Sequence, residues 1–203
     1  MPISKLLENN INWSESKVAV DPDFFERLKG QQTPEYLWIG CADSRVPANE
    51  IVGLDPGELF VHRNVANIVS ASDLNCLSVM QYAIDVLKVK HVIVCGHYGC
   101  GGVRAALEGA RVGLVDHWLG NVRWIKEVNQ AEINAISDID EQADRLCELN
   151  VLTQARNTSK NPIVRDAWAR GQELSIHSWI YRLDNGKVQT LTDPITEPLT
   201  EPS

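Results

Sequence analysis

The stretch Tyr36-Leu37-Trp38-Ile39-Gly40-Cys41-Ala42-Asp43-Ser44-Arg45 changes abruptly from apolar to polar residues. Its first five residues follow Pro34 and form a short apolar run, which is typical of a strand buried on both faces of a sheet. The polar residues begin where that strand should end. We therefore expect Cys41 and Asp43 to lie at the carboxyl end of a buried strand.

A second stretch has the same organisation. His91-Val92-Ile93-Val94-Cys95 predicts another strand, which leads into Gly96-His97-Tyr98-Gly99-Cys100-Gly101-Gly102 and a helix from Val103. In open parallel α/β sheets the functional groups gather at the carboxyl ends of strands, so the two stretches are expected to meet. The glycines do not form a phosphate loop, because the terminal Lys followed by Ser or Thr is missing. They are expected to let the backbone pass close to a bound metal.

Together the two stretches offer two thiolates, one imidazole and one carboxylate, from Cys41, Cys100, His97 and Asp43. Two sulfurs and a nitrogen suit zinc, a borderline-soft ion that prefers tetrahedral coordination. A fourth position held by water or by a labile carboxylate separates a catalytic zinc site from a closed structural one. The sequence therefore predicts a zinc centre, and the role of Asp43 determines its kind.

Asp43 lies two residues beyond Cys41 and is expected either to accept a hydrogen bond from zinc-bound water or to ligate the metal itself. Arg45, two residues further, can hold Asp43 in a bidentate, charge-assisted pair and so keep the fourth position open. The resulting zinc hydroxide is a nucleophile at near-neutral pH, suited to attack on a small electrophilic carbon. The alternative for Asp43 and Arg45 is a plain structural ion pair.

Around these strands the periodicity predicts an α/β fold, with a mainly parallel central sheet flanked by helices and a helical arm at the N-terminus. The alternating run Leu174–Tyr181 predicts a late strand, and Asp184-Asn185-Gly186 a turn into a short returning strand near Val188–Leu191. The other expected elements are a strand over Leu59–Arg63 and helices over Ile3–Trp13, from Asp21-Pro22, and over Asp73–Lys88, Leu114–Val128, Asp140–Arg156 and Pro162–Arg170. We expect one domain over residues 1–203, made of a helical arm (1–30), an α/β core (31–191) and an irregular tail (192–203).

Composition and charge restrict the partners. A chain of 203 residues with 44% hydrophobic and 23% charged residues fits one globular domain. A formal net charge of -8 argues against nucleic-acid and anionic-membrane partners, because both select basic surfaces. The first residues, MPISKLLENNINW, lack the apolar core of a secretory signal, and no run reaches transmembrane length, so we expect a cytoplasmic protein. Its five cysteines are then expected to be metal ligands and buried thiols rather than disulfides.

Three motifs carry a resemblance to a known family: CADSRVP at 41–47, GELFVHRNVAN at 57–67 and CGHYGCGG at 95–102. In these motifs and their order the chain resembles the β-class carbonic anhydrases, in particular bacterial members regulated by bicarbonate. The resemblance implies reversible hydration of carbon dioxide to bicarbonate and a proton by zinc-bound hydroxide. It implies one zinc per chain on Cys41, His97 and Cys100, with Asp43 and Arg45 as the catalytic dyad.

The resemblance also implies an assembly and a pocket. N-terminal helices of the family embrace a second subunit to form a homodimer, and dimers often pair into tetramers. The active site then lies near the subunit interface. Its expected lining is Phe60, Val65, Tyr82 from the partner chain, Gly101 and Gly102.

A further implication concerns regulation. Some bacterial members bind bicarbonate at a non-catalytic pocket built from a Trp, an Arg and a Tyr, which match Trp38, Arg63 and Tyr181 here. In those members bicarbonate or a lower pH favours a closed state in which the aspartate leaves its arginine and takes the place of water on zinc. We therefore expect Asp43 to alternate between Arg45 and the metal.

Three alternatives remain open. The same zinc hydroxide could hydrolyse carbon disulfide or carbonyl sulfide, since access to the pocket selects among small electrophiles. A non-catalytic zinc-stabilised binding module would result if Asp43 closed the coordination sphere permanently. A thiol redox protein would use Cys95 and Cys100, although their spacing is not CxxC.

The remaining cysteines and histidines are expected to be structural rather than functional. Cys95 could in principle replace Cys100 as a ligand, but a residue that closes an apolar strand is usually a buried thiol. Core positions are expected for Cys76 and Cys147. No role is assigned to His62, His91, His117 and His177, because a lone histidine is more often structural.

Overall fold

The computed structural model describes residues 2–30 and 32–199, and the chain divides into two compact units, Met1–Thr33 and Pro34–Ser203. The first unit contains α1 (Ile3–Val20) and α2 (Phe24–Gly30). Helix α1 runs seven residues beyond the predicted end at Trp13, and α2 begins later than Asp21-Pro22, because Asp21 instead ends α1. Within this unit the rings of Trp13 and Phe25 meet edge to face at 5.8 Å between centroids.

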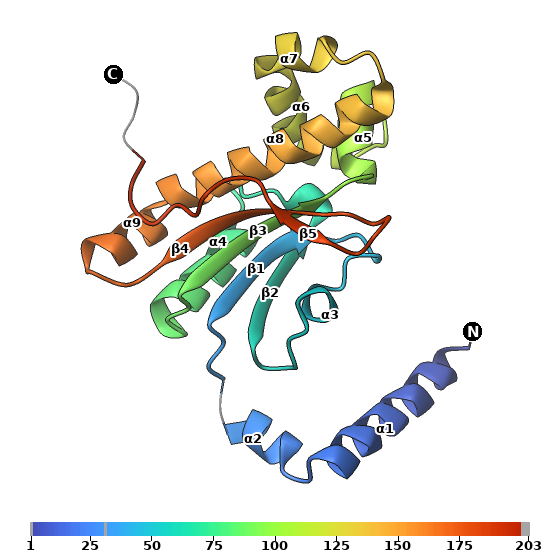
Figure 1. The fold of residues 1–203 in the computed structure, drawn as a ribbon, viewed down its shortest axis with the longest axis vertical. Coiled ribbons are helices and arrows are strands. Elements are labelled where there is room, and N and C mark those ends of the chain that lie inside the picture. Colours follow the sequence, from blue (N-terminus) through green and yellow to red (C-terminus); the bar gives the residue numbers. More distant parts are fainter. Residues whose placement is uncertain (1, 31, 200–203) are drawn as a thin grey trace. The chain divides into compact units, whose positions relative to one another are not determined.

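A five-stranded sheet with the order β2-β1-β3-β4-β5 forms the second unit (Figure 1). The first four strands in this order are parallel, and only β5 is antiparallel to its neighbour. The strands are β1 (Tyr36–Cys41), β2 (Leu59–Asn64), β3 (His91–His97), β4 (Ser175–Tyr181) and β5 (Val188–Thr190). The α/β class and the mainly parallel sheet predicted from the sequence are confirmed.

Burial along the strands follows their place in the sheet. The central strands β1 and β3 are buried at every position after the first, as their continuous apolar runs predict. Strand β4 instead alternates, with Ile176, Ser178 and Ile180 buried. The result is a large core on one face of the sheet and a smaller one around Trp38 and Ile93 on the other.

Most helices of this unit pack on the face that carries the large core, whereas the short helix Ala48–Val52 packs against the small core. Side chains such as Met80, Leu146, Val151 and Val164 join the large core with the strand residues. The helices of this unit are α3 (Ala48–Val52), α4 (Leu74–Gln81), α5 (Gly101–Glu108), α6 (Val115–Val128), α7 (Gln130–Asn134), α8 (Ile139–Lys160) and α9 (Pro162–Ala169). Of these, α3 and α7 were not predicted. None of the helices in the described part of the chain is long and apolar enough to cross a bilayer.

The helix predicted over Asp73–Lys88 is present, but its second half is π-helical rather than α-helical. Asp73 caps α4, accepting from the Asn75 amide at 3.1 Å, but α4 gives way at Tyr82–Val86 to a π-helical turn. The Leu87 amide there bonds the Tyr82 carbonyl at 3.0 Å, five residues back. Hydrophobic spacing does not distinguish this wider turn from an α-helical one.

The C-terminal segment runs along the sheet without regular structure over residues 192–199, except for a single bridge between Ile195 and Ile176. Positions 200–203 of the predicted tail lie outside the described residues. At the carboxyl edge of the sheet, β1 and β3 end side by side and α5 starts directly after Cys100. This edge carries the candidate site.

Candidate metal centre

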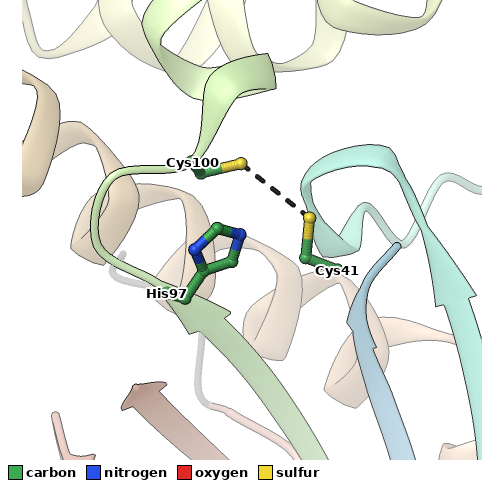
Figure 2. A group of neighbouring side chains, drawn as sticks. All are labelled: Cys41, His97 and Cys100. Carbon is green, nitrogen blue, oxygen red and sulfur yellow. Dashed lines mark hydrogen bonds between the residues drawn. The ribbon is translucent and has the colours of Figure 1, made fainter. Parts of the chain in front are cut away.

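Three donor side chains converge where β1 and β3 end. Cys41 closes β1, His97 closes β3, and Cys100 precedes the first turn of α5. Their ligand atoms all lie within 4.8 Å of one another, and the three residues are buried. Figure 2 shows the imidazole beside the two sulfurs, whose Sγ atoms are 3.9 Å apart. The predicted convergence is thus present, and the cluster can hold a metal ion.

The imidazole is oriented for ligation. His97 Nδ1 lies 2.9 Å from the carbonyl oxygen of Tyr98, which can only accept, so this nitrogen carries the proton. Nε2 is then the unprotonated nitrogen, and among the described residues it has no hydrogen-bond partner although it is buried. A buried acceptor left unpaired is costly unless another group completes it. Two sulfurs and this nitrogen fit zinc.

The two thiols share a proton. Hydrogen bonding from Cys100, with smaller contributions from the backbone amides of Asp43 and Ala66, lowers the pKa of Cys41 to about 4. The same contact with Cys41, together with burial, raises the pKa of Cys100 well above its ordinary value. One sulfur of the pair is therefore already a thiolate near neutral pH, as a metal ligand must be.

Asp43 is held away from this cluster by Arg45. The guanidinium donates from Nε to Oδ1 at 2.9 Å and from Nη2 to Oδ2 at 2.7 Å, and the Arg45 amide adds a bond to Oδ1 at 2.9 Å. These bonds hold the pKa of Asp43 well below its usual range. Oδ2 nevertheless lies 3.7 Å from His97 Nε2, so the carboxylate borders the cluster. Arg45 also donates to the Gly99 carbonyl at 3.3 Å, which ties it to the loop between His97 and Cys100.

The three residues matched to an anion pocket have different surroundings. Trp38 is fully buried, and its Nε1 lacks a hydrogen-bond partner among the described residues. Tyr181 packs against the same small core as Trp38. Arg63 donates from Nε to the Cys41 carbonyl at 2.8 Å and from Nη2 to the Asp43 carbonyl. The structure thus links Arg63 directly to the segment that carries Asp43.

The expected pocket lining is spread along the sheet: Phe60 lies near the amino end of β2, paired with Leu37, whereas Val65, Gly101 and Gly102 lie at the carboxyl edge. The rings of Phe60 and Tyr82 of one chain are 5.9 Å apart between centroids, while Val65 and Tyr82 are both well exposed. Gly101 and Gly102 open α5, and a Cβ on Gly102 would come within 2.8 Å of Val65 Cγ1. A glycine is therefore required there for close packing. The contribution of Tyr82 from a partner chain stays a prediction.

A strained turn beside the cluster was not predicted. Ala66 and Asn67, directly after β2, have φ of 64° and 47°, a left-handed conformation that is unfavourable for alanine. Two side chains from helices distant in sequence donate to carbonyls of this turn. Trp118 of α6 bonds the Val65 carbonyl, and Asn150 of α8 bonds the Ala66 carbonyl, both at 2.8 Å. An alanine carries no sequence signal for positive φ, and neither supporting residue belongs to the three motifs.

The other cysteines and histidines have local explanations. Cys95 belongs to the small core, on the opposite face of the sheet from Cys41 and Cys100, and burial raises the pKa of its thiol. A second group of possible donors, His62, Asp73 and Cys76, is already engaged. His62 Nε2 lies 3.2 Å from the side-chain Nδ2 of Asn64, Asp73 caps α4, and burial raises the pKa of Cys76 to about 12.

The chain is similar to known proteins in both sequence and structure. A sequence profile described as carbonic anhydrase matches residues 36–188. The chain is 47% identical to a carbonic anhydrase of Emericella nidulans, over 92% of this chain and 82% of that protein. The structure of a Coccomyxa β-carbonic anhydrase in complex with acetazolamide matches with a TM-score of 0.93 at 44% identity, over 97% of this chain and 89% of that one. A structure from a study of two tetrameric β-carbonic anhydrases of Sordaria macrospora matches with a TM-score of 0.91 at 40% identity, over 95% and 98% of the two chains.

Proposed function

The chain belongs to the β-class carbonic anhydrases, enzymes that hydrate carbon dioxide reversibly to bicarbonate and a proton, and we propose that Cys41, His97 and Cys100 hold one catalytic zinc ion in it. The observation that carries this proposal is His97 Nε2, which has no hydrogen-bond partner in the described part of the chain, is buried beside two sulfurs, and is bordered by a carboxylate that Arg45 restrains. A closed structural site would instead need Asp43 as a fourth ligand.

Zinc, when bound, acidifies a water molecule and so supplies a nucleophilic oxygen near neutral pH. The residues of the chain position the reactants around it. Asp43, fixed by Arg45, accepts a hydrogen bond from the attacking water through Oδ2, the oxygen that faces His97. Arg45 keeps this carboxylate from ligating the metal, and the bond between His97 and the Tyr98 carbonyl fixes the tautomer of the imidazole.

The experiment for this proposal is stopped-flow hydration of carbon dioxide by metal-quantified protein over a pH series. Rapid turnover that scales with zinc content and disappears on chelation is expected. One zinc per chain without turnover at any pH would overturn the catalytic reading in favour of a closed site. Parallel assays with carbon disulfide and carbonyl sulfide decide the substrate, because turnover of these alone would show that access to the pocket selects them.

We further propose that bicarbonate and pH regulate the enzyme through a switch of Asp43 from Arg45 to zinc. Two observations support this proposal. Trp38 Nε1 is buried, has no hydrogen-bond partner within residues 2–30 and 32–199, and is a donor suited to an anion. The Arg63 guanidinium bonds the carbonyls of Cys41 and Asp43, so an anion that engaged Arg63 would act on the segment that carries the switch.

A comparison of Trp38→Phe with the parent enzyme tests this regulation. The parent should lose steady-state activity as bicarbonate is added, beyond product inhibition, and Trp38→Phe should lose less. Trp179→Phe is a matched control, because Trp179 packs in the same small core, with its ring centroid 6.3 Å from that of Trp38. Equal inhibition of Trp38→Phe and the parent would contradict the proposal.

We also propose that the chain forms a homodimer that pairs into a dimer of dimers. The similarity to a structure described as tetrameric supports an oligomer. Helix α1 supports a role for the arm, since none of its side chains is buried while Ile3, Leu7 and Ile11 recur at helical spacing on it. Light scattering on the full chain and on Leu7→Glu/Ile11→Glu should give a tetramer and a smaller species, respectively. An unchanged mass in the variant would contradict the role of α1.

A further inference from the structure

A short loop joins two of the proposed ligands. Tyr98 and Gly99 lie between His97, which ends β3, and Cys100, which precedes α5 (Figure 2). Gly99 is exposed and has φ of 65°, and Tyr98 is half-buried, so the loop runs along the surface between two buried residues. Because an exposed loop has little packing of its own, its conformation depends on the bonds that the rest of the protein makes to it.

The conformation of this loop determines which nitrogen of His97 is free for a metal. The Tyr98 carbonyl oxygen lies 2.9 Å from Nδ1, and Asp43 Oδ2 lies 3.7 Å from Nε2, so the ring has an acceptor on each side. A neutral imidazole carries one proton, and the nearer carbonyl holds it on Nδ1. If this carbonyl turned away, the proton would favour Nε2, where the carboxylate accepts it, and Nε2 could no longer ligate a metal.

Tyr98 is anchored on both its backbone and its side chain. Its amide donates to the carbonyl of Tyr181 at 3.1 Å. Its hydroxyl donates to Oε1 of Glu148, on α8, at 2.6 Å, which is the length of a hydrogen bond to a charged carboxylate. The carbonyl of Tyr98 therefore belongs to a residue whose position is fixed at two other atoms.

Glu148 is fixed in turn by Arg145, one helical turn earlier on α8. Arg145 donates from Nη1 to Oε2 of Glu148 at 2.6 Å, so the two carboxylate oxygens serve different partners. It also donates from Nε to Glu132 of α7 at 2.6 Å. The carboxylate of Glu148 is only 24% exposed, and the guanidinium balances its charge. Hydrogen bonds thus connect α7 and α8 to Tyr98, and through its carbonyl to the imidazole.

We propose that Glu148 and Arg145 are positioning residues for the metal centre, which hold Tyr98 by its hydroxyl so that its carbonyl keeps the proton of His97 on Nδ1. The inference rests on the proposed ligation of the metal by His97. Neither positioning residue lies among the donors of the centre, and both act through Tyr98.

The test uses the full-length protein in two states. With zinc bound, release of the metal from Tyr98→Phe and Glu148→Ala to a coloured chelator should be about tenfold faster than from the parent. After removal of zinc, nitrogen-15 NMR of labelled histidines at one fixed pH shows which ring nitrogen carries the proton. The parent should hold it on Nδ1 of His97, and both variants should have a larger share on Nε2. The signals that disappear in His97→Ala identify this ring.

Matched substitutions separate this role from a merely structural one. Tyr36→Phe removes the hydroxyl of another half-buried tyrosine, at the start of β1, and Glu127→Ala removes the charge of an exposed glutamate on α6. Both should match the parent in release rate and in the position of the proton. Glu148→Gln keeps an oxygen that can accept from the Tyr98 hydroxyl, so it should release zinc more slowly than Glu148→Ala. Arg145→Ala should lie between the parent and Glu148→Ala.

The outcomes separate the inference from the function on which it rests. Parent-like release and parent-like NMR spectra in Tyr98→Phe and Glu148→Ala would overturn the positioning role while leaving the metal centre intact. Faster release with the proton still on Nδ1 would also overturn it, because the bonds would then only stabilise the loop. A parent protein that binds no zinc would overturn the metal centre, and the inference with it. If Glu148→Ala does not fold, Tyr98→Phe decides, since it removes a single hydroxyl.

Discussion

Arg45 holds Asp43 through both carboxylate oxygens, with Nε 2.9 Å from Oδ1 and Nη2 2.7 Å from Oδ2. A second pair, Arg182 and Asp184, has the same spacing in sequence and the same two contacts, at 3.1 Å and 2.8 Å, but Asp184 is an exposed turn residue. The fork of an arginine thus fixes the carboxylate two residues away in both places. Only Asp43 borders a metal centre, so Asp184 provides a matched control for it.

Asp43→Asn should keep the metal and lose most of the turnover. The amide is isosteric but carries no charge, so it is a poor acceptor for the proton of the attacking water. Loss of a positioned acid or base typically costs 10²- to 10⁴-fold, and we expect about 100-fold or more in kcat at unchanged zinc content. Asp184→Asn should match the parent. Loss of zinc together with activity in Asp43→Asn would show that the carboxylate is a permanent ligand.

Arg45→Ala should favour the closed state, because nothing then restrains Asp43 from the metal. Hydration of carbon dioxide should fall by about tenfold or more near neutral pH, and the cobalt(II) spectrum should change to that of a site with four protein ligands. Arg45→Lys should restore little, since an ammonium cannot make the two-pronged contact. Full activity with the parent spectrum in Arg45→Ala would show that Arg45 does not gate the site.

The sheet and the donors of the centre could be predicted because each depends on a local pattern. The apolar run before Cys41 and the run before His97 both predict central strands, and parallel strands bring their carboxyl ends to one edge. The dyad was predictable for the same reason, since Asp43 and Arg45 are only two residues apart. Interactions set by sequence neighbours need no knowledge of the tertiary fold.

The Val65–Asn67 turn could not be predicted, because its conformation is imposed from outside. Trp118 and Asn150, which donate hydrogen bonds to the carbonyls of the turn, are more than 50 and more than 80 residues away from it in sequence. The π-helical turn at Tyr82–Val86 was missed because its apolar residues also fit an α-helix. Both features follow from tertiary packing, which overrides local preference.

Cys41→Ser and His97→Ala should lose zinc and activity together, whereas Cys95→Ala should retain both. The first two remove ligands of the proposed centre, while Cys95 lies in the small core and donates to the Gly96 carbonyl at 3.4 Å. Metal content by atomic emission, with activity on the same samples, makes the comparison. Activity that survived chelation but disappeared in Cys95→Ala would instead favour a thiol redox protein.

Zinc binding to the metal-free protein should release about one proton near pH 7. Cys41 is already a thiolate there, since its pKa is lowered to about 4 by its contact with Cys100, whereas Cys100 keeps its proton until the metal displaces it. A zinc titration in weakly buffered solution with a pH indicator counts the protons. Release of two protons per zinc would show that the thiols do not share a proton in the metal-free protein.

The paired histidines at the start of β3 and β4 should make stability depend on pH. His91 Nδ1 lies 3.1 Å from His177 Nε2, and burial, followed by the charge of His91, lowers the pKa of His177. A base with a lower pKa in the folded state binds fewer protons there than in the unfolded chain. The free energy of unfolding therefore decreases as pH falls through the unfolded value of about 6.5.

His177→Gln keeps a hydrogen-bonding group without this titration, so its melting temperature should fall less than that of the parent between about pH 7.5 and pH 5.5. The melting temperature of His117→Gln, a substitution at an exposed position, should fall as much as that of the parent. Buried His62, whose pKa is also lowered, contributes the same pH dependence to all of these proteins. Thermal unfolding of zinc-loaded samples measures all three proteins, and equal slopes for His177→Gln and the parent would show that the pair does not titrate with unfolding.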